Sequence, residues 1–322
     1  MIAVTALACI VALVLISYIV EALRRRPTSP ARLPWGPGIA IEYANLGGVQ
    51  VRYLKTGSGP NVVLLHTLRT QLDIFQKVIP ELARRFTVYA FDYPGHGWSD
   101  IPPAEYAPED FYQWTAAFLD TLGIDEASVV GISIGGTISL VLAARQNPRI
   151  TRAISINPYD YPPAGGIRKS SSMARLILGP SGVPILGATL MRLRNRFVSD
   201  RIMAGGVSSA DALSPQLRKE LYEVGERSGH YQGFLNLLSH ERDWSEARND
   251  YARIRIPTLL IYGEQDWAPL AQRERTRALI PGVTMKTVGD GGHFLSLDRP
   301  GELTDLIVGF VANTPGPSGG RS

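Results

Sequence analysis

Short apolar runs that are typical of buried strands recur along this chain and alternate with stretches of helical periodicity. The runs are NVVLLH (61–66), TVYAFD (87–92), ASVVGIS (127–133), RAISINP (152–158), TLLIYG (258–263) and VTMKTVG (283–289). Helical patterns lie near 71–85, 108–122, 134–146, 270–280 and 299–313. Strands that are apolar on both sides must be covered on both faces. The sequence therefore predicts an α/β fold, with a mostly parallel central sheet between two layers of helices.

Two features complete this predicted domain. Residues 39–53 read as two alternating strands around Gly47-Gly48, which predicts an antiparallel hairpin at the start of the sheet. Residues 159–252 interrupt the alternation with several helical patterns and no strand, so we expect a helical insertion there. The core should then comprise residues 39–158 and 253–313, and the tail at 314–322, rich in Pro, Gly and Ser, should be disordered. A chain of 322 residues with 45% hydrophobic residues can build such a core, which excludes a disordered or fibrous protein.

The N-terminus has a different character. Residues 2–20 contain no charge and are followed by Arg24-Arg25-Arg26. About 20 apolar residues span a hydrocarbon core of roughly 30 Å, so residues 1–23 are predicted to form one transmembrane helix. A cleaved signal peptide is the alternative, but it would carry positive charge before the apolar run and a small-x-small site after it, and both are missing here. The arginines predict a cytoplasmic domain, joined to the helix by a Pro-rich linker at 24–38.

The composition gives little support for metal, disulfide or nucleic-acid chemistry. Cys9 is the only cysteine, so the chain has no internal disulfide and no CxxC metal motif. His230 and His240 lack the spacing of metal ligands, and we expect no metal and no cofactor. The net charge of +4 is too small for a chain of this length to indicate a nucleic-acid partner.

The clearest chemical motif is Gly131-Ile132-Ser133-Ile134-Gly135-Gly136, which lies where an apolar strand ends and a helical pattern begins. A G-x-S-x-G turn places a nucleophilic serine on a sharp strand-to-helix bend, where small neighbours are required. The N-terminus of the following helix directs N–H groups and its positive dipole end at the site. The alternative is a glycine-rich turn with an incidental serine. We predict that Ser133 is a nucleophile.

A serine nucleophile needs a base, and that base needs a carboxylate to orient it. His293 lies in GDGGHF just after the last strand, and Asp266 lies in GEQD just after the preceding strand. The chain order Ser, Asp, His fits a strand-to-helix nucleophile of this kind. We therefore predict a triad of Ser133, Asp266 and His293. The rivals are Glu264 and Asp290 for the acid, and His96 for the base.

Two more segments support a resemblance to a known family. His66, at the end of its strand, resembles the His-Gly that opens the oxyanion loop of α/β-hydrolase-fold proteins, and residues 92–99 (DYPGHGWS) resemble their Asp-x-x-Gly-x-Gly-x-Ser turn. From about Ile39 to Asn313 the chain is similar to serine hydrolases of that superfamily, including monoacylglycerol lipase-like and esterase-like members, and residues 159–252 correspond to their lid.

This resemblance implies an oxyanion hole formed by the backbone N–H groups of Ile134 and Leu68. Thr67 departs from the pattern, because a β-branched residue stands where glycine is usual. Ser133 at the elbow, in place of aspartate, argues against the epoxide hydrolase and dehalogenase branches.

Basic residues near this site give the substrate hypotheses. Arg69 follows the expected oxyanion donor and is a candidate to bind a substrate carboxylate or phosphate, although an ion pair with Asp73 is the simpler expectation. Between Asp160 and Asp200 the lid has no acidic residue, and its basic residues stand among apolar ones: Arg168, Lys169, Arg175, Arg192, Arg194 and Arg196. This pattern suits contact with an anionic membrane. The alternative is an apolar face packed on the domain with solvated arginines.

The sequence thus predicts a membrane-anchored serine hydrolase that cleaves carboxylic esters of hydrophobic or lipid-like substrates through an acyl-enzyme. Three alternatives stay open: a carbon–carbon bond hydrolase or an acyltransferase that uses the same triad, and a non-catalytic membrane accessory protein.

Overall fold

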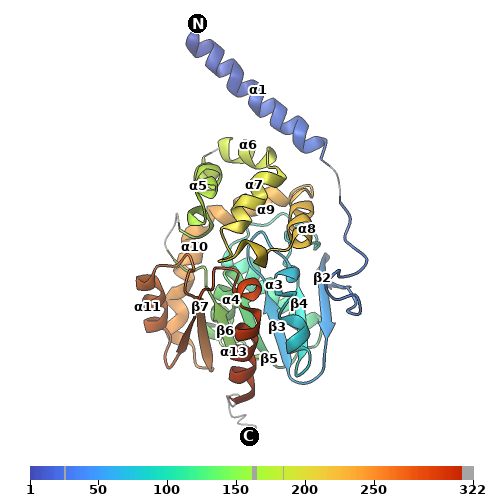
Figure 1. The fold of residues 1–322 in the computed structure, drawn as a ribbon, viewed down its shortest axis with the longest axis vertical. Coiled ribbons are helices and arrows are strands. Elements are labelled where there is room, and N and C mark those ends of the chain that lie inside the picture. Colours follow the sequence, from blue (N-terminus) through green and yellow to red (C-terminus); the bar gives the residue numbers. More distant parts are fainter. Residues whose placement is uncertain (25–26, 162–164, 184, 314–322) are drawn as a thin grey trace.

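A twisted sheet of eight strands forms the centre of the fold in the computed structural model, which describes residues 1–24, 27–161, 165–183 and 185–313 (Figure 1). The order of the strands across the sheet is β1-β2-β4-β3-β5-β6-β7-β8. Their bounds are β1 Glu42–Leu46, β2 Val49–Thr56, β3 Asn61–Leu65, β4 Thr87–Phe91, β5 Ala127–Ile132, β6 Ile150–Ile156, β7 Thr258–Gly263 and β8 Thr284–Val288. The pairs β1–β2 and β2–β4 are antiparallel, and all other pairs are parallel. The predicted fold class is confirmed.

The central strands β3 to β7 are buried on both faces, as their composition predicts, whereas in the edge strand β8 only Val288 is buried. In β3, Val63 and Leu65 belong to one hydrophobic cluster, and Val62 and Leu64 belong to the other. This division follows from the two-residue period of a strand. The helices α3 (Pro108–Thr121) and α4 (Ile134–Ala144) contribute to the first cluster, and α2 (Ile79–Leu82) and α13 (Pro300–Asn313) contribute to the second. The sheet is therefore the middle layer of three.

One expected helix is divided in the structure. In place of one helix near 71–85 there is a short 3-10 helix, η1 (Leu72–Phe75), followed by α2. Pro80 explains the break, because proline has no N–H to donate to the preceding turn of a longer helix. The helix expected near 299–313 is α13, and a short helix, α12 (Leu295–Asp298), precedes it. The remaining core helix, α11, covers Leu270–Leu279.

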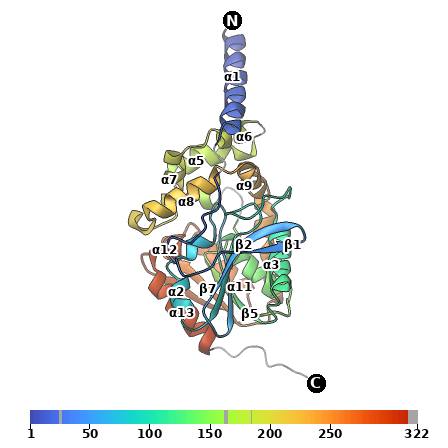
Figure 2. The same ribbon diagram turned by 90° about the vertical axis from the view of Figure 1, so that its right-hand side faces the viewer.

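The lid consists of helices, and among its described residues there is no strand. Its elements are η2 Gly166–Lys169, α5 Ser172–Leu178, η3 Gly179–Gly182, α6 Leu186–Arg192, α7 Arg196–Ala204, η4 Ala210–Ala212, α8 Pro215–Gly225, α9 His230–Ser239, α10 Glu241–Glu246 and η5 Ala247–Arg253. The helices α5 to α9 lie between the sheet and the N-terminal helix (Figures 1 and 2). Lid side chains join both hydrophobic clusters, so the lid packs on the core.

The N-terminal helix α1 (Ile2–Ala22) projects away from the body of the protein (Figure 2). Its segment Ala3–Ala22 is long and apolar enough to cross a membrane, with a mean hydropathy of 2.7. Only its C-terminal end touches the body, where it meets the lid. The predicted membrane orientation depends on Arg25 and Arg26, which lie outside the described residues. The tail at 314–322, which was predicted to be disordered, also lies outside them.

Two of the basic lid residues that were predicted to face an anionic membrane, Arg192 and Arg194, instead contact α1. The Arg192 side chain is only 3% exposed; its Nε donates to Ser17 Oγ at 3.0 Å, and its guanidinium lies over the Tyr18 ring. Arg194 pairs with Glu21 at 2.7 Å. Both guanidinium groups are thus occupied inside the protein, so the basic-lid hypothesis is wrong for these two residues, and so is the alternative that they are solvated.

The Pro-rich segment after α1 also packs on the core. Leu33 is fully buried in the second hydrophobic cluster, and Trp35 donates from its indole nitrogen to Asp73 Oδ1 at 2.6 Å. The segment is therefore fixed to the body at these residues, and it is not a free spacer along its whole length.

Candidate active site

Ser133 lies at the carboxyl end of β5, directly before the first residue of α4. Its backbone has φ 56° and ψ −115°, a conformation that residues other than glycine rarely adopt. Glycine is required on both sides of it. A Cβ on Gly131 would lie 2.0 Å from the Gly135 carbonyl oxygen, and a Cβ on Gly135 would lie 2.1 Å from the Leu65 oxygen. The turn therefore has the strained geometry expected of a nucleophile elbow.

The hydroxyl of Ser133 is fully buried and has no hydrogen-bond partner among the described residues. Buried polar atoms nearly always have a partner, and exceptions often mark chemical function. Nε2 of His293 is also buried and also lacks a partner among the described residues. The two groups that a serine nucleophile and its base would present to each other are thus both unsatisfied.

His293 and Asp266 are hydrogen bonded, with 2.5 Å between Nδ1 and Oδ1. Asp266 is fixed in turn, because its other carboxylate oxygen accepts the backbone N–H of Ala268 at 3.0 Å. A carboxylate on Nδ1 assigns the proton to that nitrogen and leaves the lone pair on Nε2. The imidazole is therefore in the form that accepts a proton at Nε2.

The rival candidates for the acid and the base have other contacts. Asp290 is exposed and pairs with Arg299 at 3.0 Å, and the Glu264 carboxylate accepts the backbone N–H of Asp290. His96 is buried among aromatic rings, with Nδ1 3.2 Å from the Pro94 carbonyl oxygen, and burial lowers its pKa to about 3. Among the candidates for acid and base, Asp266 and His293 are the pair that the fold brings together.

Two residues near His293 were missed by the sequence analysis. The indole ring of Trp267 stacks on the imidazole, with ring centroids 3.8 Å apart. Asn157, just past β6, accepts the N–H of Gly263 at 2.9 Å and donates to the carbonyl oxygens of Gly292 and His293 at 3.1 and 2.9 Å. Asn157 thus joins the end of β7 to the histidine loop. The sequence offered one signal for Asn157. It lies at the end of β6, the strand between the one that precedes Ser133 and the one that precedes Asp266.

The segment after β3 has the geometry of an oxyanion loop. His66 donates from Nδ1 to the Thr67 carbonyl oxygen at 2.8 Å and accepts the N–H of Tyr93 at Nε2. Burial lowers the pKa of His66 to about 4, so the imidazole is neutral. The same Thr67 oxygen accepts the hydroxyl of Thr70. In the described part of the chain, the N–H groups of Leu68 and Ile134 have no acceptor, so both are free to bind an oxyanion.

Arg69 makes a different contact from the expected one. Asp73 accepts hydrogen bonds from Arg52, Trp35 and Gln71, so the predicted ion pair between Arg69 and Asp73 is wrong. The guanidinium of Arg69 instead lies 3.1 Å from Nδ1 of His230 and over the ring of Phe234. Arg52 outcompetes it because Arg52 is fully buried in the sheet, between Asp73 and Asp92.

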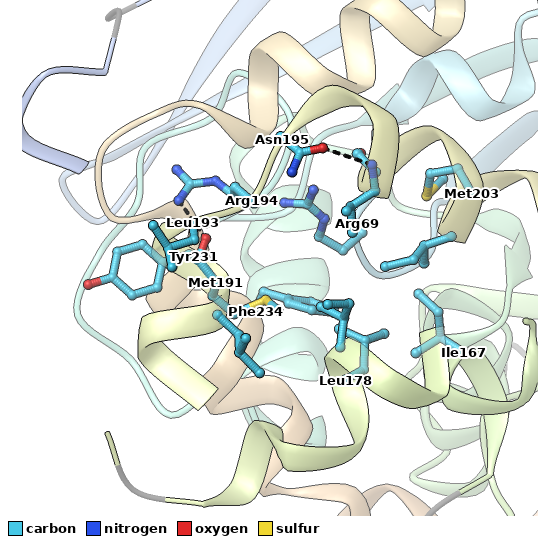
Figure 3. A pocket seen from close by; sticks show the side chains of 15 residues that line it. Arg69, Ile167, Leu178, Met191, Leu193, Arg194, Asn195, Met203, Tyr231 and Phe234 are labelled. Atoms are coloured by element: carbon cyan, nitrogen blue, oxygen red, sulfur yellow. Dashed lines mark hydrogen bonds between the residues drawn. The ribbon is translucent and has the colours of Figure 1, made fainter. Parts of the chain in front are cut away.

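A pocket of about 130 Å³ lies among the lid helices, and Arg69 is part of its wall (Figure 3). Ser133, Asp266 and His293 are not among the residues that line it. Apolar side chains dominate its lining, and the polar ones are few. The lining residues are Arg69, Ile167, Ile177, Leu178, Leu190, Met191, Leu193, Arg194, Asn195, Val198, Ser199, Ile202, Met203, Tyr231 and Phe234. Such a pocket suits a hydrophobic chain. In the described ranges, no cluster of three His, Cys, Asp or Glu side chains fits a metal ion.

The strand order, the elbow after β5 and the helical lid are those of an α/β hydrolase. The chain has the α/β-hydrolase fold, and the model of the family described as "alpha/beta hydrolase fold" matches its residues 60–177. The match to this family supports hydrolase activity.

Named proteins that are similar to this chain have several activities. A 2-hydroxy-6-oxo-2,4-heptadienoate hydrolase of Pseudomonas putida is 26% identical over 83% of this chain and 94% of its own length. A carboxylesterase of Bacillus subtilis is 26% identical over 82% of this chain and 86% of its own length. The crystal structure of a bacterial membrane phospholipase A superposes on 97% of this chain and 95% of its own, with a TM-score of 0.70 and 20% identity. These matches agree on the fold and differ in reaction.

Proposed function

We propose that this protein is a membrane-anchored serine hydrolase that cleaves carboxylic esters of hydrophobic or lipid-like acyl groups. One observation carries the proposal. Ser133 Oγ and His293 Nε2 are both buried and unpaired, while Asp266 holds the other nitrogen of the same imidazole. A structural serine and a structural histidine would normally satisfy these atoms with partners of their own.

In the reaction, Ser133 Oγ attacks the ester carbonyl carbon, and its proton passes to Nε2 of His293. The carboxylate of Asp266 stabilises the resulting imidazolium. The negative charge on the carbonyl oxygen is stabilised by the N–H groups of Leu68 and Ile134. His293 then returns the proton to the departing alcohol, which leaves an acyl group on Ser133. Water, deprotonated by His293, releases the acid and restores the serine.

The hydrophobic acyl group is supported by the pocket. Its lining is mainly aliphatic and aromatic, and it adjoins Arg69, the residue after the oxyanion donor Leu68. A soluble ester with a short acyl group would leave most of this apolar surface unfilled, and so would gain less binding free energy. The carboxylesterase relative supports the same reaction class.

The membrane part of the proposal rests on α1. Ala3–Ala22 is 6% buried, so almost all of its apolar surface faces outward. Ser17 and Tyr18 belong to this apolar run, yet they contact Arg192 at the end of α6. If α1 spans the bilayer, α6 therefore lies at the membrane surface. Exposed apolar side chains at this end of the lid, which are Leu176, Val183, Ile185 and Leu186, would meet lipid there. The positive charge of Arg24–26 favours a cytoplasmic hydrolase domain.

A second candidate reaction is cleavage of a carbon–carbon bond by the same triad, which the Pseudomonas putida relative favours.

A panel of substrates tests both candidate reactions. The full-length protein in non-ionic micelles should react with a fluorophosphonate probe and hydrolyse p-nitrophenyl esters, with a preference for long acyl chains over acetate. Ser133→Ala should lose both activities. Ser139→Ala is the matched control, since Ser139 is a buried serine of α4 that donates to the Gly135 carbonyl oxygen. Hydrolysis of a vinylogous 1,5-diketone acid but of no ester would favour the second reaction. Labelling that persists in Ser133→Ala would contradict both.

The anchor has its own test. Alkaline carbonate washing should leave the full chain in the membrane pellet and should extract a chain that lacks residues 1–22. Protease added to intact spheroplasts should spare the hydrolase domain if the domain is cytoplasmic. Extraction of the full chain would contradict a spanning helix, and digestion by external protease would contradict the orientation.

A further inference from the structure

Arg69 is a cation without a counter-ion. Within the described residues, no carboxylate lies within 4 Å of its guanidinium, and its only polar contact is the neutral acceptor Nδ1 of His230. The masked positions contain no Asp or Glu that would supply a partner. Arginines in protein interiors are usually paired with carboxylates, because an unpaired buried charge is destabilising. Arg69 is half-buried, so the lack of a carboxylate partner costs less stability than it would for a fully buried charge.

The surroundings of Arg69 increase this cost. Burial, together with the nearby positive charges of Arg194 and Arg24, lowers its pKa to about 10. Those two arginines have carboxylate partners of their own, since Glu21 pairs with both and Glu226 pairs with Arg24. Arg69 is the member of this cluster that lacks one. The local field at its guanidinium therefore favours an anion.

The other contacts of Arg69 do not neutralise it. The ring of Phe234 lies 5.5 Å from the guanidinium carbon, and the His230 imidazole occupies Nη1. Nε and Nη2 donate to no described residue. The backbone of Arg69 has φ 57°, a left-handed conformation that arginine rarely adopts. Strained residues of this kind often occur at ligand sites, where the strain fixes a side chain in place.

The lining of the pocket indicates that the rest of the ligand is apolar. In Figure 3 the Arg69 side chain projects among apolar side chains of the lid, which include Met191, Leu178 and Phe234. A chain of methylene groups would fill this space, and an oxygen anion at its end would meet the free nitrogens of the guanidinium. Because Arg69 follows Leu68, the anion would bind next to the loop that carries the oxyanion donor.

We propose that the lid pocket binds amphiphiles that carry a carboxylate or phosphate group, with Arg69 as the receptor for that group. The inference rests on the proposed function in one respect, because it names the class of substrate that the same site would select. Charge-assisted hydrogen bonds to a guanidinium are strong enough to give a preference of about tenfold or more over a neutral amphiphile. Carboxylate and phosphate share this chemistry, so the test includes both.

Binding is measured without catalysis, in the full-length Ser133→Ala protein in non-ionic micelles. Dodecanoate, dodecyl phosphate and dodecanol are titrated at equal concentrations, and the shift in the thermal unfolding midpoint gives the relative affinity. We expect the anionic ligands to bind about tenfold or more tightly than dodecanol. Adding Arg69→Gln should remove that preference, and Arg69→Lys should keep part of it. Arg196→Gln is the matched control, since Arg196 is an exposed lid arginine that should not affect the preference. Equal binding of all three ligands, or an anion preference that survives in Arg69→Gln, would overturn the proposal.

Stability without ligand separates a binding role from a structural one. If Arg69 is held for a ligand, Arg69→Gln should unfold at the same temperature as the parent or higher, because it removes an uncompensated charge. A structural arginine would behave in the opposite way, and a clear fall in the unfolding temperature would count against the proposal.

A kinetic comparison keeps the two proposals distinct. In the active enzyme, Arg69→Gln should raise KM for the monomethyl ester of dodecanedioic acid about tenfold more than it raises KM for methyl dodecanoate. Equal effects on both esters would refute the role of Arg69 and leave the hydrolase proposal standing. If the wild-type protein hydrolyses neither ester, the hydrolase proposal fails, and the binding experiment still decides the role of Arg69.

Discussion

Arg192 of the lid donates a hydrogen bond from Nε to Ser17 Oγ of the N-terminal helix, and both side chains are buried by this contact. The residues are 175 positions apart in the chain. Arg192 has no carboxylate within 4 Å in the described structure, and its other contacts are hydroxyl groups and tyrosine rings. The N-terminal helix therefore completes the packing of the lid. In this structure it is more than a tether.

The first prediction concerns Glu21, which connects α1 to the lid through Arg24 and Arg194. Glu21→Gln leaves these two largely buried arginines with one carboxylate partner fewer. We expect the free energy of unfolding to fall by about 2–3 kcal/mol and tryptic cleavage of the lid to accelerate. Glu274→Gln is the control, because Glu274 forms an exposed pair with Arg277 that should contribute less than about 1 kcal/mol. Equal losses in the two variants would argue against a structural role for this contact.

The second prediction concerns acid stability. Burial lowers the pKa of His96 to about 3, whereas an unfolded histidine titrates near 6.5. As the pH falls below 6.5, the unfolded chain takes up a proton that folded His96 does not, so stability is lost progressively down to about pH 3. At pH 5 this one histidine should account for about 2 kcal/mol of the loss relative to pH 7.5.

Denaturant unfolding at pH 7.5 and pH 5 measures this effect. His96→Gln should lose less stability between the two pH values than the wild-type protein does. His240→Gln should not reduce the loss, because the carboxylates of Asp243 and Glu105 lie against that imidazole. If the acid sensitivity of His96→Gln equals that of the wild type, His96 does not remain neutral in the folded state.

Local patterns were enough to predict the sheet and the elbow. A strand that is buried on both faces leaves a continuous apolar run, and the glycines around Ser133 are required by contacts with their immediate neighbours, such as Gly131 with Gly135. The order of Asp266 and His293 after successive strands brought them to one edge of a parallel sheet. These features depend on residues that are close in sequence, or on the common direction of parallel strands.

The choice of partners for charged groups was not predictable in the same way. Arg69 is four residues from Asp73, a spacing that favours an ion pair on a helix, but residues 69–71 are not helical and Arg52 reaches the carboxylate first. Arg192 and Arg194 read as a basic patch because their partners on α1 lie more than 170 positions away. Asn157 gave no motif, since its role comes from three backbone groups on two other loops. Long-range packing decides each of these cases.

The third prediction separates the candidate acids. Asp266→Asn should lower kcat by about 10³–10⁴-fold, because an amide no longer holds the proton on Nδ1 of His293 or stabilises the imidazolium. Asp290→Asn is the control, since Asp290 is exposed and pairs with Arg299, and its kcat should be unchanged. Ester hydrolysis at saturating substrate measures both variants. A severe loss in Asp290→Asn with normal turnover in Asp266→Asn would reverse the assignment.

The fourth prediction concerns Asn157 as a positioning residue. Its amide holds the carbonyl oxygens of Gly292 and His293, and its side-chain oxygen accepts the N–H of Gly263, so it sets the distance between the histidine loop and β7. In Asn157→Asp the contact with Gly263 persists, but a carboxylate oxygen replaces the donor and repels the two carbonyl oxygens. We therefore expect Asn157→Asp to move His293 and to lower kcat by about 10–100-fold, with a smaller change in KM.

A second measurement distinguishes positioning from a general loss of stability. At a temperature well below unfolding, the rate at which a fluorophosphonate labels Ser133 should fall in parallel with kcat, and the pH at which labelling is half-maximal should shift, because the environment of His293 has changed. Asn147→Ala is the matched control: it removes an asparagine that accepts a backbone N–H in the loop before β6, far along the chain from the histidine. If Asn157→Asp unfolds at a lower temperature but keeps the wild-type labelling rate and pH profile, Asn157 supports the fold and does not position the base.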